Sequence, residues 1–278
     1  MHADDVANYY DANTRRFLRF GQGGDVGAIH RAVWGPGVQT RAQAFRYVDD
    51  RLLSLIPDDA KRVLDLGCGV GASLEHIAKQ RAVEGVGVTL SRVQAELANA
   101  RFEQAGLAQR VVCRQADFTA LPDDLGTFDF AYGIESYVQS PSAQAFFSEA
   151  ARVTNPGATL AICDDFISGR AHAGELSFRE ARWLREFRAG WGAPSLVSVG
   201  QASALARRHG FSLVLDDDLT DHLELRRPRD HLITLMVRAG RRVPTQSPWW
   251  RNLLGGNALQ MLLVRRVSTY RLLVFRRH

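Results

Sequence analysis

Three glycines at alternate positions follow an acidic residue in the stretch "VLDLGCGVGASLEHIA", residues 63–78. The apolar run that carries Asp65 predicts a buried strand, and the amphipathic pattern that begins after Gly71 predicts a helix. Glycine has no Cβ, so a loop built on Gly67, Gly69 and Gly71 lets the backbone approach a ligand closely. The carboxyl end of a strand is where parallel sheets bind their ligands. We therefore expect a ligand-binding loop with an acid beside it.

Three classes of ligand compete for such a loop. The dinucleotide fingerprint G-x-G-x-x-G does not fit, because the third glycine comes one residue early. The phosphate-binding loop wants Lys-Ser/Thr after its last glycine, and Ala72 and Ser73 follow instead. Asp65 would sit badly beside a pyrophosphate but suits the cationic aminopropyl-carboxylate end of S-adenosylmethionine. The pattern D-x-G-x-G-x-G after a strand favours S-adenosylmethionine.

A second acid that could do chemistry is Glu135 in "GIESYVQSP", residues 133–141, which follows another apolar run. At the same edge of the sheet, its carboxylate could stabilise a developing positive charge or remove a proton. A glutamate that only caps the following helix is the alternative.

Apolar runs alternate with helical patterns from Val63 onward, which predicts a parallel sheet with helices on both faces. The predicted strands are residues 62–67, 83–90, 110–117, 128–135, 155–166, 211–219 and 268–277. Ser91 is expected to cap a helix, and Gly210 to end one. The expected fold is α/β and Rossmann-like, with a seven-stranded, mostly parallel sheet and a helical cap.

Four regions are expected along the chain. Residues 1–50 are an aromatic segment too apolar to remain free, which should fold over the core, and residues 51–167 form the ligand-binding core. Residues 168–200 are a helical lid insertion, and residues 201–278 complete the sheet and the acceptor pocket.

Composition narrows the class of protein. The 278 residues are 46% hydrophobic, with a net charge of +5 that is mostly arginine. These arginines are expected to be solvated or to meet a local anion, and no aromatic-basic pattern predicts nucleic-acid binding. Cys68, Cys113 and Cys163 have no C-x-x-C spacing, so reduced thiols and no zinc site are expected. No secretory leader or stable membrane insertion is expected, which favours a cytoplasmic location.

The glycine motif resembles that of the class I S-adenosylmethionine-dependent methyltransferases from roughly Val63 to Phe166. The resemblance implies that the loop residues, with Cys68 and Gly133, bind the cofactor. "QADFTALP" would place Asp117 on the adenine amino group and Phe118 against the ring. A turn acid or helix cap is the alternative for Asp117.

One narrower group is similar in "GVTLSRVQAELANAR": the C-methyltransferases of sterol, tocopherol-type and geranyl diphosphate substrates. The usual ribose-binding acid is absent here, and the resemblance places Thr89, Leu90 and Gln94 on the ribose side instead. "IES" resembles the motif that supplies that group's active-site glutamate, which makes Glu135 the first catalytic candidate. A solvated helix position is the alternative for Gln94.

The remaining site residues follow from looser similarities and from residue type. The catalytic list is completed by Tyr10 and His30, although His30 alone is more often structural. The acceptor pocket is expected to be lined by Tyr9, Phe17, Trp34, Tyr137, His222 and Glu224, with Phe20 among the same aromatic residues. Arg226 and Arg227 could meet an anionic group, with a solvated loop as the equal alternative.

The expected function is methylation of a small hydrophobic molecule in specialised metabolism. The leading interpretation is C-methylation of an isoprenoid alkene through a carbocation that is then deprotonated. O- or N-methylation of a phenolic or amine natural product is the alternative, and a non-catalytic scaffold is disfavoured by the intact loop. No protein metal site is expected, and a role for Mg²⁺ is expected only if the acceptor is a diphosphate. The oligomeric state is left open, a homo-oligomer included.

Overall fold

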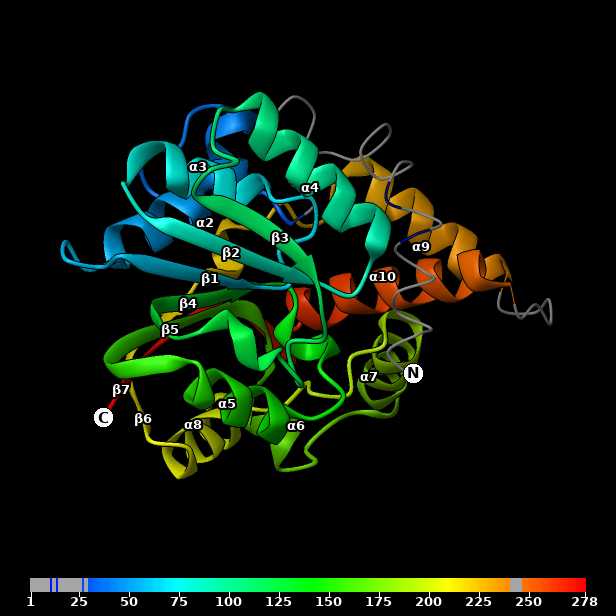
Figure 1. The fold of residues 1–278 in the computed structure, drawn as a ribbon. Helices are drawn as coiled ribbons and strands as arrows, with labels where there is room; N and C mark the ends of the chain where they lie inside the picture. The colour runs from blue at the N-terminus through cyan, green and yellow to red at the C-terminus, as the bar shows by residue number, and fades with distance from the viewer. Residues whose placement is uncertain (1–10, 12–13, 15–26, 28–29, 241–246) are drawn as a thin grey trace.

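The computed structural model describes residues 11, 14, 27, 30–240 and 247–278 (Figure 1). Strands and helices alternate along most of this length. The strands are β1 (Arg62–Leu66), β2 (Glu84–Thr89), β3 (Val111–Gln115), β4 (Phe128–Ile134), β5 (Thr154–Ile167), β6 (Phe211–Asp218) and β7 (Ser268–Arg277). The α-helices are α2 (Arg41–Leu55), α3 (Ala72–Gln80), α4 (Arg92–Gln104), α5 (Ala143–Arg152), α6 (Gly169–His172), α7 (Phe178–Trp191), α8 (Val199–Arg208), α9 (Pro228–Gly240) and α10 (Pro248–Val264).

The seven strands form one sheet in the order β3-β2-β1-β4-β5-β7-β6. β1 pairs in parallel with β2 and β4, and β4 pairs in parallel with β5, whereas β7 is antiparallel to both β5 and β6. Figure 1 shows α2, α3 and α4 over one face of the sheet, with α5 and α8 over the other. The predicted α/β fold with a mostly parallel, seven-stranded sheet is confirmed.

The core lies on both faces of the central strands. In β4, the alternate residues Phe128, Phe130 and Tyr132 are fully buried, as are their neighbours Ala131 and Gly133. A strand covered by helices on both faces needs apolar residues without interruption, which is why "FDFAYGI" is readable as a central strand. In the helix layer that contains α5, Phe146 and Phe147 pack against each other and against aromatic rings from other elements.

The helix signals expected from single residues are also observed. The Ser91 hydroxyl accepts a hydrogen bond from the Gln94 N–H at the start of α4. Gly210 has a φ of +80° after α8, in the left-handed region that glycine tolerates best. The strand predicted at residues 268–277 corresponds to β7, which follows α10.

Two insertions lie at the carboxyl edge of the sheet. α6 and α7 follow β5 and lie within residues 168–200. α9 and α10 connect the carboxyl end of β6 to the first residue of β7, and β7 starts opposite Ile167 at the end of β5. α10 crosses α7 closely, since a Cβ on Gly190 would lie 2.8 Å from the Gly255 Cα. None of the helices among the described residues is both long and apolar enough to cross a membrane.

The expected regional boundaries can be compared with these elements. The boundary after residue 50 falls inside α2, and the boundary after residue 200 falls inside α8. α2 begins with a capping box between Thr40 and Gln43, and its buried face includes Phe45 and Leu52. The end of the aromatic segment is thus continuous with a helix that packs on the core.

Candidate active site

The glycine loop that follows β1 has positive φ values, which glycine adopts at little cost in free energy. Gly67, Gly69 and Gly71 have φ values of +106°, +53° and +75°. A Cβ on Gly67 would lie 2.5 Å from the Ser136 Cβ, and a Cβ on Gly133 would lie 2.8 Å from the Ser136 Oγ. The Ser136 hydroxyl donates to the Leu66 carbonyl at 2.5 Å. The loop and the exit of β4 therefore pack directly against each other.

The first turn of α3 has the properties of an anion site. Its N-cap is Gly71, in the left-handed conformation and without a side-chain hydrogen bond to the helix. Uncapped N–H groups and the helix dipole favour a negative group at this position. The carboxylate of an amino-acid moiety fits this end, and the loop beside it admits a close ligand.

Asp65 lies beneath the loop and is only 2% exposed. Burial raises its pKa to about 7, partly offset by Tyr132, with Asp49 adding to the rise. A buried acid that is near its pKa at neutral pH would be ionised by a neighbouring positive charge. That behaviour fits recognition of a cationic ligand rather than a pyrophosphate.

The predicted ribose-side residues are brought together. The Thr89 hydroxyl donates to Gln94 Oε1 at 2.7 Å, and both side chains are buried. The Leu90 carbonyl accepts from Gln115 Nε2 at 3.1 Å. Asp11 reaches the same helix start, where it accepts from the Ser91 hydroxyl and from the Val93 N–H. Gln94 is therefore not a solvated helix residue.

The predicted adenine-side residues follow β3. One oxygen of Asp117, Oδ1, accepts from the Thr119 N–H and hydroxyl, both at 2.7 Å, as a turn acid does. No donor from the described part of the chain reaches its other oxygen. The Phe118 ring lies 3.9 Å from the Cβ that Gly67 would carry, so ring and loop share one space.

Two of the three cysteines meet at the loop. The Sγ atoms of Cys68 and Cys113 are 3.2 Å apart, and both are free thiols. A hydrogen bond to Cys113 and burial raise the pKa of Cys68 well above its usual range. Cys68 is therefore a packing thiol under the loop, and its backbone N–H donates to Val88.

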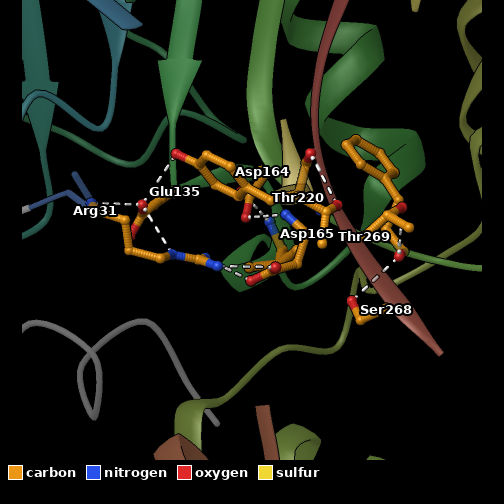
Figure 2. Close-up of polar contacts among 10 residues, drawn as sticks. Arg31, Glu135, Asp164, Asp165, Thr220, Ser268 and Thr269 are labelled. Atoms are coloured by element: carbon orange, nitrogen blue, oxygen red, sulfur yellow. Dashed lines mark hydrogen bonds and ion pairs between the residues drawn. The ribbon is translucent and has the colours of Figure 1, made fainter. Parts of the chain in front are cut away.

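Glu135 lies at the end of β4 in a network that sequence reasoning had not anticipated (Figure 2). Its Oε1 accepts from the Arg31 N–H at 2.8 Å, from Arg31 Nε at 3.1 Å and from the Tyr270 hydroxyl at 3.0 Å. Within the described residues, no donor reaches Oε2. Glu135 also has a φ of +52°, a conformation that costs free energy in a residue with a side chain.

The guanidinium of Arg31 continues the network to β5. Nη1 and Nη2 donate to the two oxygens of Asp165 at 3.0 and 2.6 Å, and the guanidinium carbon lies 4.3 Å from the centre of the Tyr270 ring. Burial disfavours the charged arginine, but Asp165 and Glu135 raise its pKa well above the usual range. Burial raises the pKa of Asp165, and Arg31 partly offsets that rise.

Asp164 is the third acid of this cluster. It is fully buried, and it accepts from the Val138 and Asp165 N–H groups at 3.1 and 2.8 Å. Burial and the charge of Asp165 raise its pKa well above the usual range. Two carboxyl groups, those of Glu135 and Asp165, thus contact the guanidinium of Arg31, and Asp164 lies next to Asp165 with backbone N–H partners of its own.

His30 is placed close to Glu135 but is turned to a different partner. Its Nδ1 is 3.2 Å from the Arg31 carbonyl, and its Nε2 is 3.7 Å from Asp49 Oδ1. Burial lowers the pKa of His30, but Asp49 and Glu135 raise it overall. Asp49 in turn has a lowered pKa, because His30 and Arg46 outweigh the effect of burial. This pairing favours a charged, structural histidine.

Four of the predicted pocket residues lie in the described part of the chain, namely Trp34, Tyr137, His222 and Glu224. Trp34 and His222 are joined through their backbones, and Glu224 forms ion pairs with Arg41 and Arg227. Tyr137 is fully buried among Phe146, Phe147 and Phe166, with its hydroxyl unpaired within the described residues. Tyr9, Tyr10, Phe17 and Phe20 lie outside the described residues.

A cavity of about 380 Å³ adjoins the insertion. Ile167, Ala171, Leu184, Leu196 and Val197 supply its apolar wall, with His172, Arg188, Pro194 and Gln201 also in its lining. Several residues of the 168–200 segment therefore border a hollow at the end of β5. Among the described residues predicted to line the acceptor pocket, Trp34, Tyr137, His222 and Glu224 are not in the lining of this cavity.

Arg31, Asp165 and Tyr270 are the site residues that sequence reasoning missed. A usable signal existed for one of them: "ICDDF" places two consecutive acids inside an apolar run, which is unfavourable unless they are paired. Arg31 and Tyr270 carry no such local signal, since they are 104 and 135 residues away from Glu135.

Comparison with known proteins agrees with this geometry. A methyltransferase-domain family model matches residues 63–157. "O-methyltransferase rstn1" of Aspergillus nomiae is 32% identical over 226 residues, covering 79% of this chain and 94% of that protein. "Sterol 24-C-methyltransferase erg6" of Schizosaccharomyces pombe is 32% identical over 161 residues, covering 58% of this chain. This chain spans only 42% of the length of that relative.

The fold is also that of solved enzymes. A geranyl diphosphate methyltransferase in complex with geranyl diphosphate and sinefungin superposes with a TM-score of 0.76 and 18% identity, covering 99% of both chains. At this identity the superposition shows the fold alone. The sequence relatives carry the assignment, and on that evidence the chain belongs to the class I S-adenosylmethionine-dependent methyltransferases.

Proposed function

We propose that this protein methylates a carbon atom of a small hydrophobic alkene, of isoprenoid type, with Glu135 as the group that accepts the leaving proton. The observation that carries the proposal is the geometry of Glu135. One carboxylate oxygen is fixed by three donors, and the second oxygen is left without a donor among the described residues. A base that is oriented and still has a free oxygen is suited to proton transfer.

The local charge supports a cationic acceptor. Glu135 and Asp165 both contact the guanidinium of Arg31, and the Tyr270 ring presents a π-face beside it. An alkene that gains a methyl group becomes a carbocation, and preorganised negative groups stabilise such a charge as it develops. The side chain of Glu135 is 19% exposed, so it is accessible without being well solvated.

Bound S-adenosylmethionine would supply the electrophilic methyl group. The residues proposed to hold it are the glycine loop with Asp65, the Thr89–Gln94 pair, and Asp117 with Phe118. The Oε2 of Glu135 would then take a proton from a carbon next to the cationic one, and the electron pair of that C–H bond would form the double bond of the alkene product. Arg31 and Tyr270 keep the carboxylate in position for that step.

A second candidate is O-methylation of a natural product. It is favoured by one comparison: the O-methyltransferase from Aspergillus nomiae is covered almost over its full length by this chain. In that reaction, Glu135 would take the proton of a hydroxyl group instead. The two candidates differ in where the methyl group is found in the product.

Glu135→Gln tests the proposal on a panel of prenyl diphosphates, terpenoids and phenols with methyl-labelled S-adenosylmethionine. Glutamine keeps the shape and an acceptor oxygen but removes the base. We expect kcat to fall by about 10² or more, with the KM for S-adenosylmethionine little changed.

Glu149→Gln is the matched control. Glu149 is also paired with an arginine, Arg152, and its side chain is 16% exposed, but it lies on α5 away from Glu135. Wild-type kcat in Glu135→Gln would overturn the role of Glu135. A labelled methyl group on oxygen would replace the first candidate with the second.

A further inference from the structure

Helix α9 presents an apolar stripe to solvent. Leu232 is 59% exposed, Leu235 is 60% exposed and Met236 is 43% exposed. Their spacing of three and four residues places them on one side of the helix, whereas Val237 and Asp230 are buried on the opposite side. Large apolar residues gathered on one exposed face mark an interaction surface more often than scattered ones do.

Positive side chains border this stripe. At 100° per residue, Arg229 lies on one flank of Leu232 and Leu235, and Arg238 lies on the other, and both are exposed. Arg229 is 55% exposed in its side chain and only 3.8 Å from Asp230. An apolar face with cationic flanks is the arrangement of helices that lie in the plane of a membrane surface.

An exposed tryptophan lies near the C-terminal end of α9. Trp249, at the start of α10, is 53% exposed. It contacts the ring of Trp250, and the Trp250 ring packs so closely on the end of α9 that a Cβ on Gly240 would lie 2.2 Å from it. An amphipathic indole next to an apolar helix face is typical of the interface between water and lipid.

We propose that the outer face of α9, with Trp249, docks on the surface of an anionic lipid bilayer. Leu232, Leu235 and Met236 would enter the boundary between headgroups and acyl chains, and Arg229 and Arg238 would meet the negative headgroups. The charge flanks favour anionic lipid over a second copy of this chain, whose α9 would present the same positive flanks.

The position of α9 makes this docking relevant to the site. α9 and α10 are inserted between the carboxyl end of β6 and the start of β7, the edge of the sheet at which the glycine loop and Glu135 also lie. Docking through α9 would bring that edge toward a source of hydrophobic acceptors. The docking itself does not depend on the proposed reaction, and it is measured without turnover.

The test is flotation with vesicles of phosphatidylcholine alone and with about 30% phosphatidylglycerol. We expect binding only to the anionic vesicles, a blue shift of tryptophan emission that Trp249→Phe diminishes, and weakening in 0.5 M salt. The triple change Leu232→Ser, Leu235→Ser and Met236→Ser should weaken binding by about tenfold or more. Arg229→Gln with Arg238→Gln should weaken it by about 25-fold, about fivefold for each charge.

Matched control variants test whether a change in vesicle binding is specific to the α9 surface. Val214→Ser removes a residue of β6 that is 59% exposed, and Arg207→Gln removes an exposed charge on α8. Both should bind like wild type, and all variants should keep the wild-type Tm because the changed side chains are exposed.

Absence of binding to anionic vesicles by the wild type would overturn the proposal. So would a triple variant that binds vesicles normally. A triple variant that instead converts a dimer into a monomer in light scattering would assign the surface to a second copy.

Discussion

Arg31→Met should destabilise the protein by an amount that depends on pH. Arg31 holds Asp165 through two hydrogen bonds of 3.0 and 2.6 Å and Glu135 through Nε at 3.1 Å. Removal of one partner of a buried ion pair costs roughly 3–5 kcal/mol, because the remaining charge is left unpaired. The Arg31 side chain is 22% exposed, so water offsets part of this, and we expect a loss of about 2–4 kcal/mol at pH 8.

The pH dependence of this stability loss tests whether the unpaired carboxylate of Asp165 causes it. Burial raises the pKa of Asp165, and Arg31 limits the rise, so the pKa rises further in Arg31→Met. A carboxyl group whose pKa is higher in the folded state than in the unfolded state makes the fold lose stability as pH rises between those two values. The deficit of the variant should therefore be smaller at pH 5 than at pH 8, by at most about 1.4 kcal/mol per pH unit for each proton.

Urea unfolding at several pH values measures this effect. Arg31→Met combined with Asp165→Asn should recover part of the loss, since the unpaired charge is gone. Arg92→Met is the control, because Arg92 and its partner Glu96 are both well exposed, and it should change stability little. A deficit below about 1 kcal/mol at pH 8, or one that grows as pH falls, would refute the argument.

Three further outcomes concern the cofactor site. Affinity for S-adenosylmethionine, measured by calorimetry, should rise between pH 6 and pH 8, because Asp65 ionises with a pKa of about 7. Asp65→Asn should bind the cofactor more weakly and should not show that rise. Gly67→Ala should lower the Tm and weaken cofactor binding, because its Cβ would lie 2.5 Å from the Ser136 Cβ at a φ of +106°; a wild-type Tm would contradict this. Thr89→Val breaks the 2.7 Å bond to Gln94 and should weaken cofactor binding about fivefold to tenfold in the same titration, whereas unchanged affinity would remove the pair from the site.

The sequence predicted those parts of the fold that repeat a local pattern. The strands from β1 to β5 lie in mostly apolar segments, and α4 begins at a recognisable cap, Ser91. α9 was not predicted. The segment before it is rich in charge, and apolar residues occur on both sides of the helix, since Leu232 and Leu235 are exposed and Val237 is buried, so no single apolar face stands out.

The candidate site likewise has one part that the sequence predicted and one part that it did not. The residues of the glycine loop lie within a few positions of one another, so their spacing carried the prediction. The network around Glu135 is assembled from β4, β5, β7 and the segment before α2, and Arg31 reaches Asp165 across 134 positions of sequence. No pattern in a single sequence reports which distant strand will provide the partner of an acid.

The place of β7 in the sheet has a consequence for how the protein folds. β7 lies between β5 and β6, yet it follows both in the chain, and Arg276 pairs with Thr159 across more than 100 residues. Until residues 268–277 are inserted, β5 and β6 each have an unpaired edge that could pair with another molecule. Such distant pairing closes slowly, so the assembly of the sheet should be the rate-limiting stage of refolding and the stage most exposed to aggregation. A chain truncated before Ser268 would remain at that stage, with both edges open.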